Sequence, residues 1–159
     1  MPSANSRRKP ASRRQQRFVT RAGGGVGASE HAIQEAWFDW WRAWAPTQGY
    51  SPILAFAVPN AGKRSFRAAV WLRAEGLQPG VYDVLLAIPA RLWHGLFMEF
   101  KRPGEPLTAD QANFGQAARM QGYGAILVRS TEEAILATTE YLGRREKGPR
   151  FLDFVPSRP

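Results

Sequence analysis

The sequence has no cysteine and only two histidines, His31 and His94, which lie far apart along the chain. The lack of cysteine excludes disulfides and thiolate metal sites, and the two histidines do not have the spacing of a zinc motif. No run of 18 apolar residues occurs, so we expect no helix that crosses a membrane. The basic N-terminus is not followed by the apolar core of a secretory signal, so we do not expect secretion.

Acidic residues are also few, at 13 against 22 lysines and arginines, and the net charge of +9 favours a polyanionic partner, most simply nucleic acid. Residues 1–21 contain seven of the basic residues and no acidic one. This composition predicts a disordered basic tail over residues 1–28 that ends in a glycine hinge, with Arg13 and Arg14 as candidate phosphate contacts. A flexible extension without a partner and an arginine-rich targeting peptide are the alternatives, although Pro10 would interrupt the helix of the latter.

Capping residues and apolar periodicity predict elements in the order α-β-α-β-β-α-β-α. This order predicts an α/β domain over residues 29–143, with a mixed sheet of about four strands flanked by helices. Residues 144–159 form a polar tail whose apolar residues could dock on this domain. The expected helices are 29–44, 65–75, 108–122 and 130–143, and the expected strands are 53–58 (a buried one), 81–88, 92–101 and 125–128.

Tryptophans dominate the first expected helix. Ile33, Trp37, Trp41 and Trp44 fall on one helical stripe, with Trp40 beside it. Aromatic rings at this spacing are typical of a protein core or a subunit interface rather than of base stacking.

Two expected strands carry isolated charges. Glu99 and Lys101 share one face of strand 92–101, and Asp83 is the only charge in the apolar strand 81–88. If the two strands form a hairpin centred on Arg91, the numbers of paired residues add to 182 and Asp83 lies opposite Glu99. Facing carboxylates repel, and a cation with oxygen ligands such as Mg²⁺ would relieve the repulsion. A register shift of one residue would separate them.

Each of these residues also has a purely structural interpretation. Glu99 and Lys101 could form a plain ion pair, and Glu30 could only complement the dipole of the first helix. Gln111 could only close the capping box that Thr108 opens. His94 lies near the turn of the hairpin, so we expect a structural role for it.

Several ordered motifs resemble the virus-type replication-repair nuclease (VRR-NUC) domain, a member of the PD-(D/E)xK nuclease superfamily. The resemblance spans about residues 30–142 and departs from the family pattern at Tyr82, where proline is usual before the aspartate. The motifs are Glu30-x-x-Ile33-Gln34, Pro59-Asn60-Ala61-Gly62-Lys63-Arg64, Gly76-Leu77-x-Pro79-Gly80-Val81-x-Asp83, Glu99-x-Lys101-Arg102-Pro103-Gly104, Gln111 and Gly122-Tyr123.

The resemblance implies a restriction-endonuclease-like core and an endonuclease that hydrolyses DNA with Mg²⁺ or Mn²⁺. Asp83, Glu99 and the backbone carbonyl of Phe100 would hold the metal. Lys101 would orient or deprotonate the attacking water, with Glu30 and Gln111 as further catalytic residues. The candidate DNA contacts are Asn60, Lys63, Arg64, Arg67 and Arg102, together with Arg13 and Arg14 of the tail.

The resemblance further implies a homodimer that acts on branched DNA such as a Holliday junction, or on flaps or nicks. The protein would then be a DNA-associated cytoplasmic protein of bacterial or viral origin. The alternative from another class is a non-catalytic nucleic-acid-binding protein that uses the basic tail, with the carboxylates serving only the fold.

Overall fold

The computed structural model describes residues 28–59 and 71–143. The basic tail, most of the second expected helix and the C-terminal tail lie outside these residues. The described helices are α2 (Glu30–Trp44), α4 (Ala109–Met120) and α5 (Thr131–Tyr141), with short 3-10 turns at Ala45–Gln48 and Pro52–Leu54. The strands are β1 (Ala55–Ala57), β2 (Val84–Leu86), β3 (Leu96–Phe100) and β4 (Gly124–Val128).

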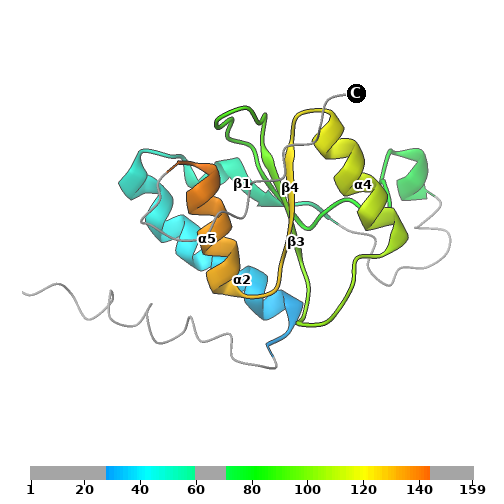
Figure 1. Ribbon diagram of the computed structural model, residues 1–159, viewed down its shortest axis with the longest axis horizontal. Coiled ribbons are helices and arrows are strands. Elements are labelled where there is room, and N and C mark those ends of the chain that lie inside the picture. Colours follow the sequence, from blue (N-terminus) through cyan, green and yellow to red (C-terminus); the bar gives the residue numbers. More distant parts are fainter. Residues whose placement is uncertain (1–27, 60–70, 144–159) are drawn as a thin grey trace, which may run out of the picture.

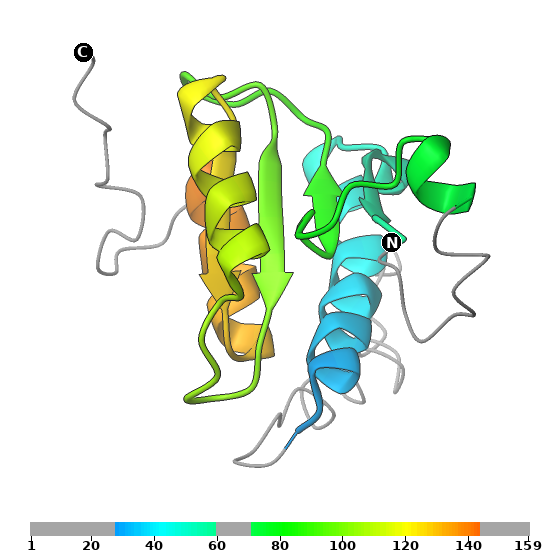
Figure 2. The same ribbon diagram turned by 90° about the vertical axis from the view of Figure 1, so that its right-hand side faces the viewer.

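The strands form one mixed sheet in the order β1-β2-β3-β4, in which only the β3–β4 pair is parallel. Helices α2 and α5 cover one face of the sheet and α4 covers the other (Figure 1, Figure 2). The predicted mixed sheet with flanking helices is therefore confirmed. No helix in the described ranges is both long enough and apolar enough to span a lipid bilayer.

The predicted hairpin register is confirmed. Val84 pairs with Met98 and Leu86 with Leu96, so paired numbers add to 182. Arg91 sits at the tip with φ 56°, a left-handed conformation that tightens the turn. Asp83 lies one residue before β2, and continuing the register places it opposite Glu99.

The expected strand 53–58 is only partly confirmed. Its first residues form a 3-10 turn, and β1 lies at an edge of the sheet. Ala55 is buried, whereas Ile53 is 80% exposed and Phe56 45% exposed, so the prediction of a buried strand was wrong. An apolar run has the same appearance on an edge strand as on a central one, because position in the sheet depends on distant partners.

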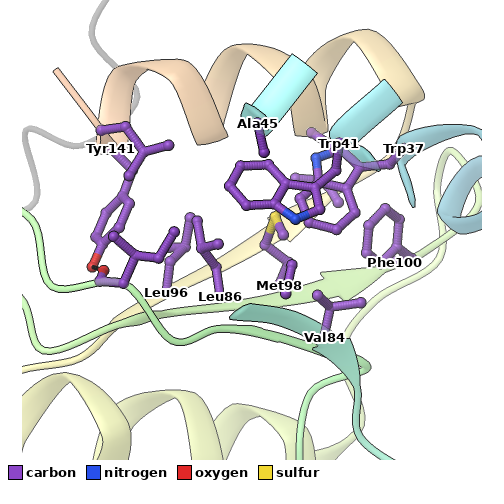
Figure 3. Packing of buried hydrophobic residues seen from close by; sticks show 14 of the residues in the cluster. Trp37, Trp41, Ala45, Val84, Leu86, Leu96, Met98, Phe100 and Tyr141 are labelled. Atoms are coloured by element: carbon purple, nitrogen blue, oxygen red, sulfur yellow. Dashed lines mark hydrogen bonds between the residues drawn. The ribbon is translucent and has the colours of Figure 1, made fainter. Parts of the chain in front are cut away.

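The tryptophan stripe of α2 builds the larger core (Figure 3). Trp37 and Trp41 are fully buried, and their stacked rings lie 6.0 Å apart. Both indole N–H groups are satisfied: Trp37 donates to Thr138 Oγ1 at 3.1 Å and Trp41 to the Pro52 carbonyl at 2.9 Å. Of the two expected roles of this stripe, core and subunit interface, the structure shows the first for Ile33, Trp37 and Trp41, which are buried in this core.

A smaller cluster lies under α4 on the opposite face. Tyr82, Ala118 and Ala125 are its buried members, and Phe97 and Phe114 pack against them. His94 stays exposed near this cluster, with its ring 5.7 Å from that of Tyr123. The two clusters thus pack against opposite faces of β3, and Glu99 near its end is the first charged residue of the strand.

Candidate active site

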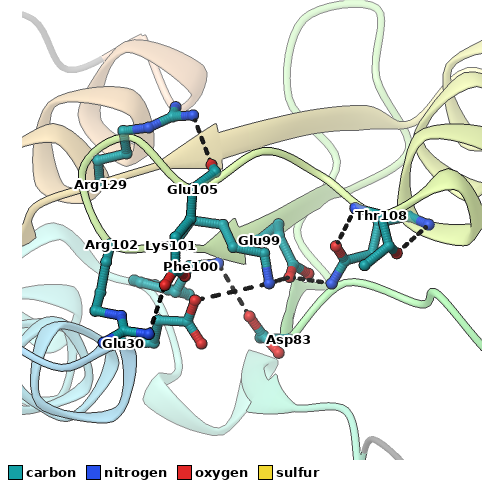
Figure 4. A network of polar contacts seen from close by, with 10 residues as sticks. Glu30, Asp83, Glu99, Phe100, Lys101, Arg102, Glu105, Thr108 and Arg129 are labelled. Carbon is teal, nitrogen blue, oxygen red and sulfur yellow. Dashed lines mark hydrogen bonds and ion pairs between the residues drawn. The ribbon is translucent and has the colours of Figure 1, made fainter.

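The candidate site begins at the end of β3, where a buried carboxylate meets a lysine. Glu99 is only 1% exposed, and its Oε1 lies 2.9 Å from Lys101 Nζ. The strand periodicity that the sequence showed puts both side chains on one face. The same Nζ lies 3.7 Å from Glu30 Oε1, so Lys101 bridges two carboxylates that come from β3 and α2 (Figure 4).

Asp83 reaches the same place from the segment that precedes β2. Its Oδ2 accepts a hydrogen bond from the Phe100 N–H at 3.0 Å. This contact ties the start of β2 to the end of β3 and fixes the aspartate next to Glu99. The Phe100 side chain points the other way, into the larger core. Phe100 thus anchors the strand through its side chain and orients Asp83 through its backbone N–H.

Gln111 has both of the roles that the sequence left open. Its Oε1 accepts from the Thr108 N–H at 2.9 Å, which together with the Thr108 side chain completes the capping box of α4. Its Nε2 donates to Glu99 Oε1. Because an amide group has a separate acceptor and donor, capping the helix and contacting the site do not compete.

Glu30 is the first residue of α2, directly after the capping residue Ser29. Burial and a hydrogen bond with the Glu105 carboxyl group raise the pKa of Glu30 above its ordinary value, against the charge of Lys101, which lowers it. The pKa of Glu105 is lowered by the same hydrogen bond. The carboxyl groups of Glu30 and Glu105 thus interact directly, and their pKa values shift in opposite directions.

Glu105 also belongs to this site, although no motif in the sequence predicted it. The residue lies in the loop after β3, where its carboxylate pairs with Arg102, a candidate DNA contact, and its backbone carbonyl accepts from Arg129 at 3.0 Å. The only signal in the sequence was the three-residue spacing from Arg102 across Pro103 and Gly104. That spacing predicts a turn, but the approach of the turn to α2 depends on the tertiary fold.

The electrostatics of the site reflect its crowded negative charge. Burial raises the pKa of Glu99 to about 7. The hydrogen bond from Lys101 lowers this pKa, whereas the nearby charges of Asp83 and Glu30 raise it further. Desolvation lowers the pKa of Lys101, but the hydrogen bond and charge of Glu99 outweigh it, so the pKa stands above its ordinary value. Lys101 therefore carries its proton at neutral pH.

The residues fit a divalent cation of the Mg²⁺ type. Glu99 Oε2 is buried and has no hydrogen-bond partner among the described residues, although Oε1 of the same carboxylate has two. A buried carboxylate oxygen without a partner is costly, and a cation would satisfy it. Within residues 28–59 and 71–143, no three acidic or histidine side chains form a ready-made ligand cluster. Mg²⁺ does not require one, because it retains several waters and uses one or two carboxylates.

The structure thus brings together Glu30, Asp83, Glu99, Phe100, Lys101 and Gln111, all named from the sequence. Arg102 stands at the rim and is 61% exposed. The remaining candidate DNA contacts lie outside the described residues: Arg13, Arg14, Asn60, Lys63, Arg64 and Arg67.

The mixed four-stranded sheet with helices on both faces is consistent with a restriction-endonuclease-like fold. A solved structure described as a "VRR_NUC domain protein" shares this fold with a TM-score of 0.62. It is 18% identical in sequence, and the match covers 76% of this chain and 93% of that one. The resemblance to VRR-NUC domains is therefore confirmed at the level of the fold. No model of a known protein family and no curated protein matches the chain.

Proposed function

We propose that this chain is a nuclease that hydrolyses phosphodiester bonds in DNA with the help of Mg²⁺ or Mn²⁺. One observation carries the proposal: Asp83, Glu99 and Lys101 converge at one end of the sheet, and one buried oxygen of Glu99 has no partner among the described residues. The ion pair with Lys101 uses only Oε1 and so does not satisfy this buried oxygen, whereas a cation would. The shared fold with a VRR_NUC domain protein supports the same reaction class.

Asp83, Glu99 and the Phe100 carbonyl would hold the cation, which supplies positive charge that acidifies water and offsets the charge building up on the phosphate. Lys101, whose pKa stands above its ordinary value, would act as a donor that steadies the attacking water or a phosphate oxygen. Gln111 holds Glu99 by one oxygen and leaves the other free for the cation. Glu30, next to Lys101, orients the ammonium group.

In the reaction, the oxygen of water forms a bond to phosphorus, and the bond from phosphorus to the 3′ oxygen breaks. The leaving oxygen gains a proton and becomes a 3′-hydroxyl, and the other product ends in a 5′-phosphate.

We propose that the protein is an endonuclease that acts on branched DNA such as a Holliday junction, or on flaps or nicks. We further propose that it acts as a homodimer, in the cytoplasm of a bacterium or of a cell infected by a virus. Residues 29–143 would form the nuclease domain.

The direct test incubates the protein with a four-way junction, a flap, a nicked duplex and a linear duplex, in Mg²⁺, in Mn²⁺ and in EDTA. We expect cleavage only with metal, and a loss of roughly 10³-fold in Asp83→Asn and Lys101→Met, because each removes a charged group that acts in the transition state.

Matched controls come from an exposed ion pair of α2. Arg42 and Asp39 lie 3.4 Å apart at the surface, so Asp39→Asn and Arg42→Met remove one negative and one positive charge away from the site. Both controls should cleave like the wild type. Equal cleavage by all variants would mean a contaminating nuclease and would contradict the proposal. DNA binding without metal-dependent cleavage would support the second candidate, a non-catalytic nucleic-acid-binding protein, which the basic tail favours.

Removal of residues 1–21 separates binding from chemistry. The segment contains seven basic residues, so its loss should weaken DNA binding and reduce the salt dependence of log K by up to about six, at roughly 0.9 per neutralised phosphate. Cleavage at saturating DNA should be retained, as measured in single-turnover reactions. An unchanged salt slope would show that the tail does not contact phosphates.

A further inference from the structure

The segment that leads into Asp83 also contacts α4, at two points on either side of Gln111. The first contact is at Gly80, whose φ is +80° and where an added Cβ would lie 2.4 Å from the Asp110 backbone carbon. The second is made by Tyr82, the residue at which the sequence departs from the VRR-NUC pattern. Its ring lies in the smaller cluster, 5.5 Å from that of Phe114.

Tyr82 fills the space that a side chain at position 115 would otherwise occupy. A Cβ added to Gly115 would lie 2.3 Å from Tyr82 Oη and 3.0 Å from Cζ, and real Cβ atoms do not approach other atoms below 3.0 Å. Glycine in the middle of a helix is unfavourable compared with alanine. Its presence in α4 is therefore explained by the tyrosine that packs against it.

Gly115 and Gln111 are four residues apart, so they lie on the same face of α4 in successive turns. The distance between this face of α4 and the sheet, which depends on Tyr82, therefore determines how closely Gln111 approaches Glu99. The same short segment continues into Asp83, which is hydrogen-bonded to the Phe100 N–H at 3.0 Å. Asp83, Glu99 and Gln111 come from three separate elements, and the packing of residues 80–83 on α4 joins all three.

We propose that Tyr82 is a positioning residue. Its contact with Gly115 sets the distance between α4 and the sheet, so that Gln111 binds Glu99 Oε1 and leaves Oε2 available for a cation. The catalytic consequence of this inference rests on the proposed nuclease function. The positioning itself does not, because it concerns contacts within the protein.

The test is a cycle of three variants, Tyr82→Phe, Gly115→Ala and the double variant Tyr82→Phe/Gly115→Ala. Gly115→Ala should push α4 outward or displace the tyrosine, shift the NMR signal of the Gln111 side-chain amide and weaken Mn²⁺ binding in calorimetry by roughly tenfold, the equivalent of one hydrogen bond. The turnover number should fall by a similar factor while KM for DNA stays constant. Tyr82→Phe alone should change these readouts less than Gly115→Ala does, because the ring remains between the sheet and α4.

The double variant should recover most of the loss, because the atom in closest conflict with the new methyl group is the hydroxyl oxygen that phenylalanine lacks. Ala117→Gly is the control: it makes the reverse exchange at an exposed position of the same helix and should leave the Gln111 signal in place. If Gly115→Ala does not fold, a folded double variant with the wild-type Gln111 signal would support the proposal by itself.

An unchanged Gln111 signal and unchanged Mn²⁺ affinity in Gly115→Ala would overturn the inference, and so would a double variant as impaired as Gly115→Ala. A wild type that cuts no DNA would instead overturn the proposed function. The NMR signal would still decide whether Tyr82 positions Gln111.

Discussion

The two faces of β3 differ in what their side chains do, although they belong to one strand of five residues. On one face, Leu96, Met98 and Phe100 are fully buried among the tryptophans of α2. On the other, half-buried Phe97 is followed by the buried carboxylate of Glu99. The side chains of the apolar face make packing contacts and one hydrogen bond, from Thr138 Oγ1 to Met98 Sδ at 3.8 Å. The other face contains a charged group that weakens the fold.

The difference shows how a small domain can tolerate a buried carboxylate. Burial of an ionised group without full pairing destabilises a protein, and the raised pKa of Glu99 is a measure of that destabilisation. The apolar residues on either side of it in the strand offset this effect by packing against the opposite helices. Because side chains alternate between the two faces of β3, one face contributes to stability and the other carries the residue of the proposed chemistry.

The sharpest way to test this separation is to remove the charge of Glu99 alone. Glu99→Gln keeps the shape of the side chain and a carbonyl oxygen for Lys101, but it loses a cation ligand. We expect metal-dependent cleavage to fall by roughly 10³-fold or more, as for the loss of a group that acts in the transition state. Single-turnover cleavage of branched DNA measures the effect. Retained cleavage would show that this face of β3 has no part in the chemistry.

Met98→Ala changes the neighbouring residue on the opposite face. Met98 is fully buried within the core around Trp37, so the substitution leaves a cavity and should lower the free energy of unfolding by about 2–5 kcal/mol. Denaturant titration measures the loss. The folded fraction should keep its metal affinity, and a large drop in that affinity would contradict the separation of the two faces.

The third prediction concerns pH and the metal-free protein. In the folded chain Glu99 releases its proton at a pKa of about 7, whereas in the unfolded chain the pKa is close to the ordinary glutamate value of 4.5. Ionisation of Glu99 therefore reduces the stability of the wild type as the pH rises from about 4.5 to about 7, and the reduction persists above that range. Glutamine does not titrate. Relative to the wild type, Glu99→Gln should thus gain about 2 kcal/mol between pH 5 and pH 8 in EDTA.

Denaturant titration at the two pH values measures this gain. Met98→Ala is the matched control, because its difference from the wild type should be the same at both pH values. A constant difference for Glu99→Gln would mean that Glu99 is ionised throughout and that its burial has little cost.

Local patterns were enough to predict the two faces of β3 and the pairing of Asp83 with Glu99. Strand alternation and the symmetry of a tight hairpin depend on residues close in sequence. Features that depend on distant contacts were not predicted. The edge position of β1, the approach of Glu105 to Glu30 and the contact of Tyr82 with Gly115 each join segments whose distance is set by the whole fold.

The capping box of α4 restricts which substitutions position 111 can accept. In most helices, glutamate closes such a box as well as glutamine does. Here the same side chain also touches Glu99, so glutamate would preserve the helix start yet bring one more negative group against a buried carboxylate. Position 111 therefore requires an uncharged side chain, although the capping of α4 alone would accept glutamate as well.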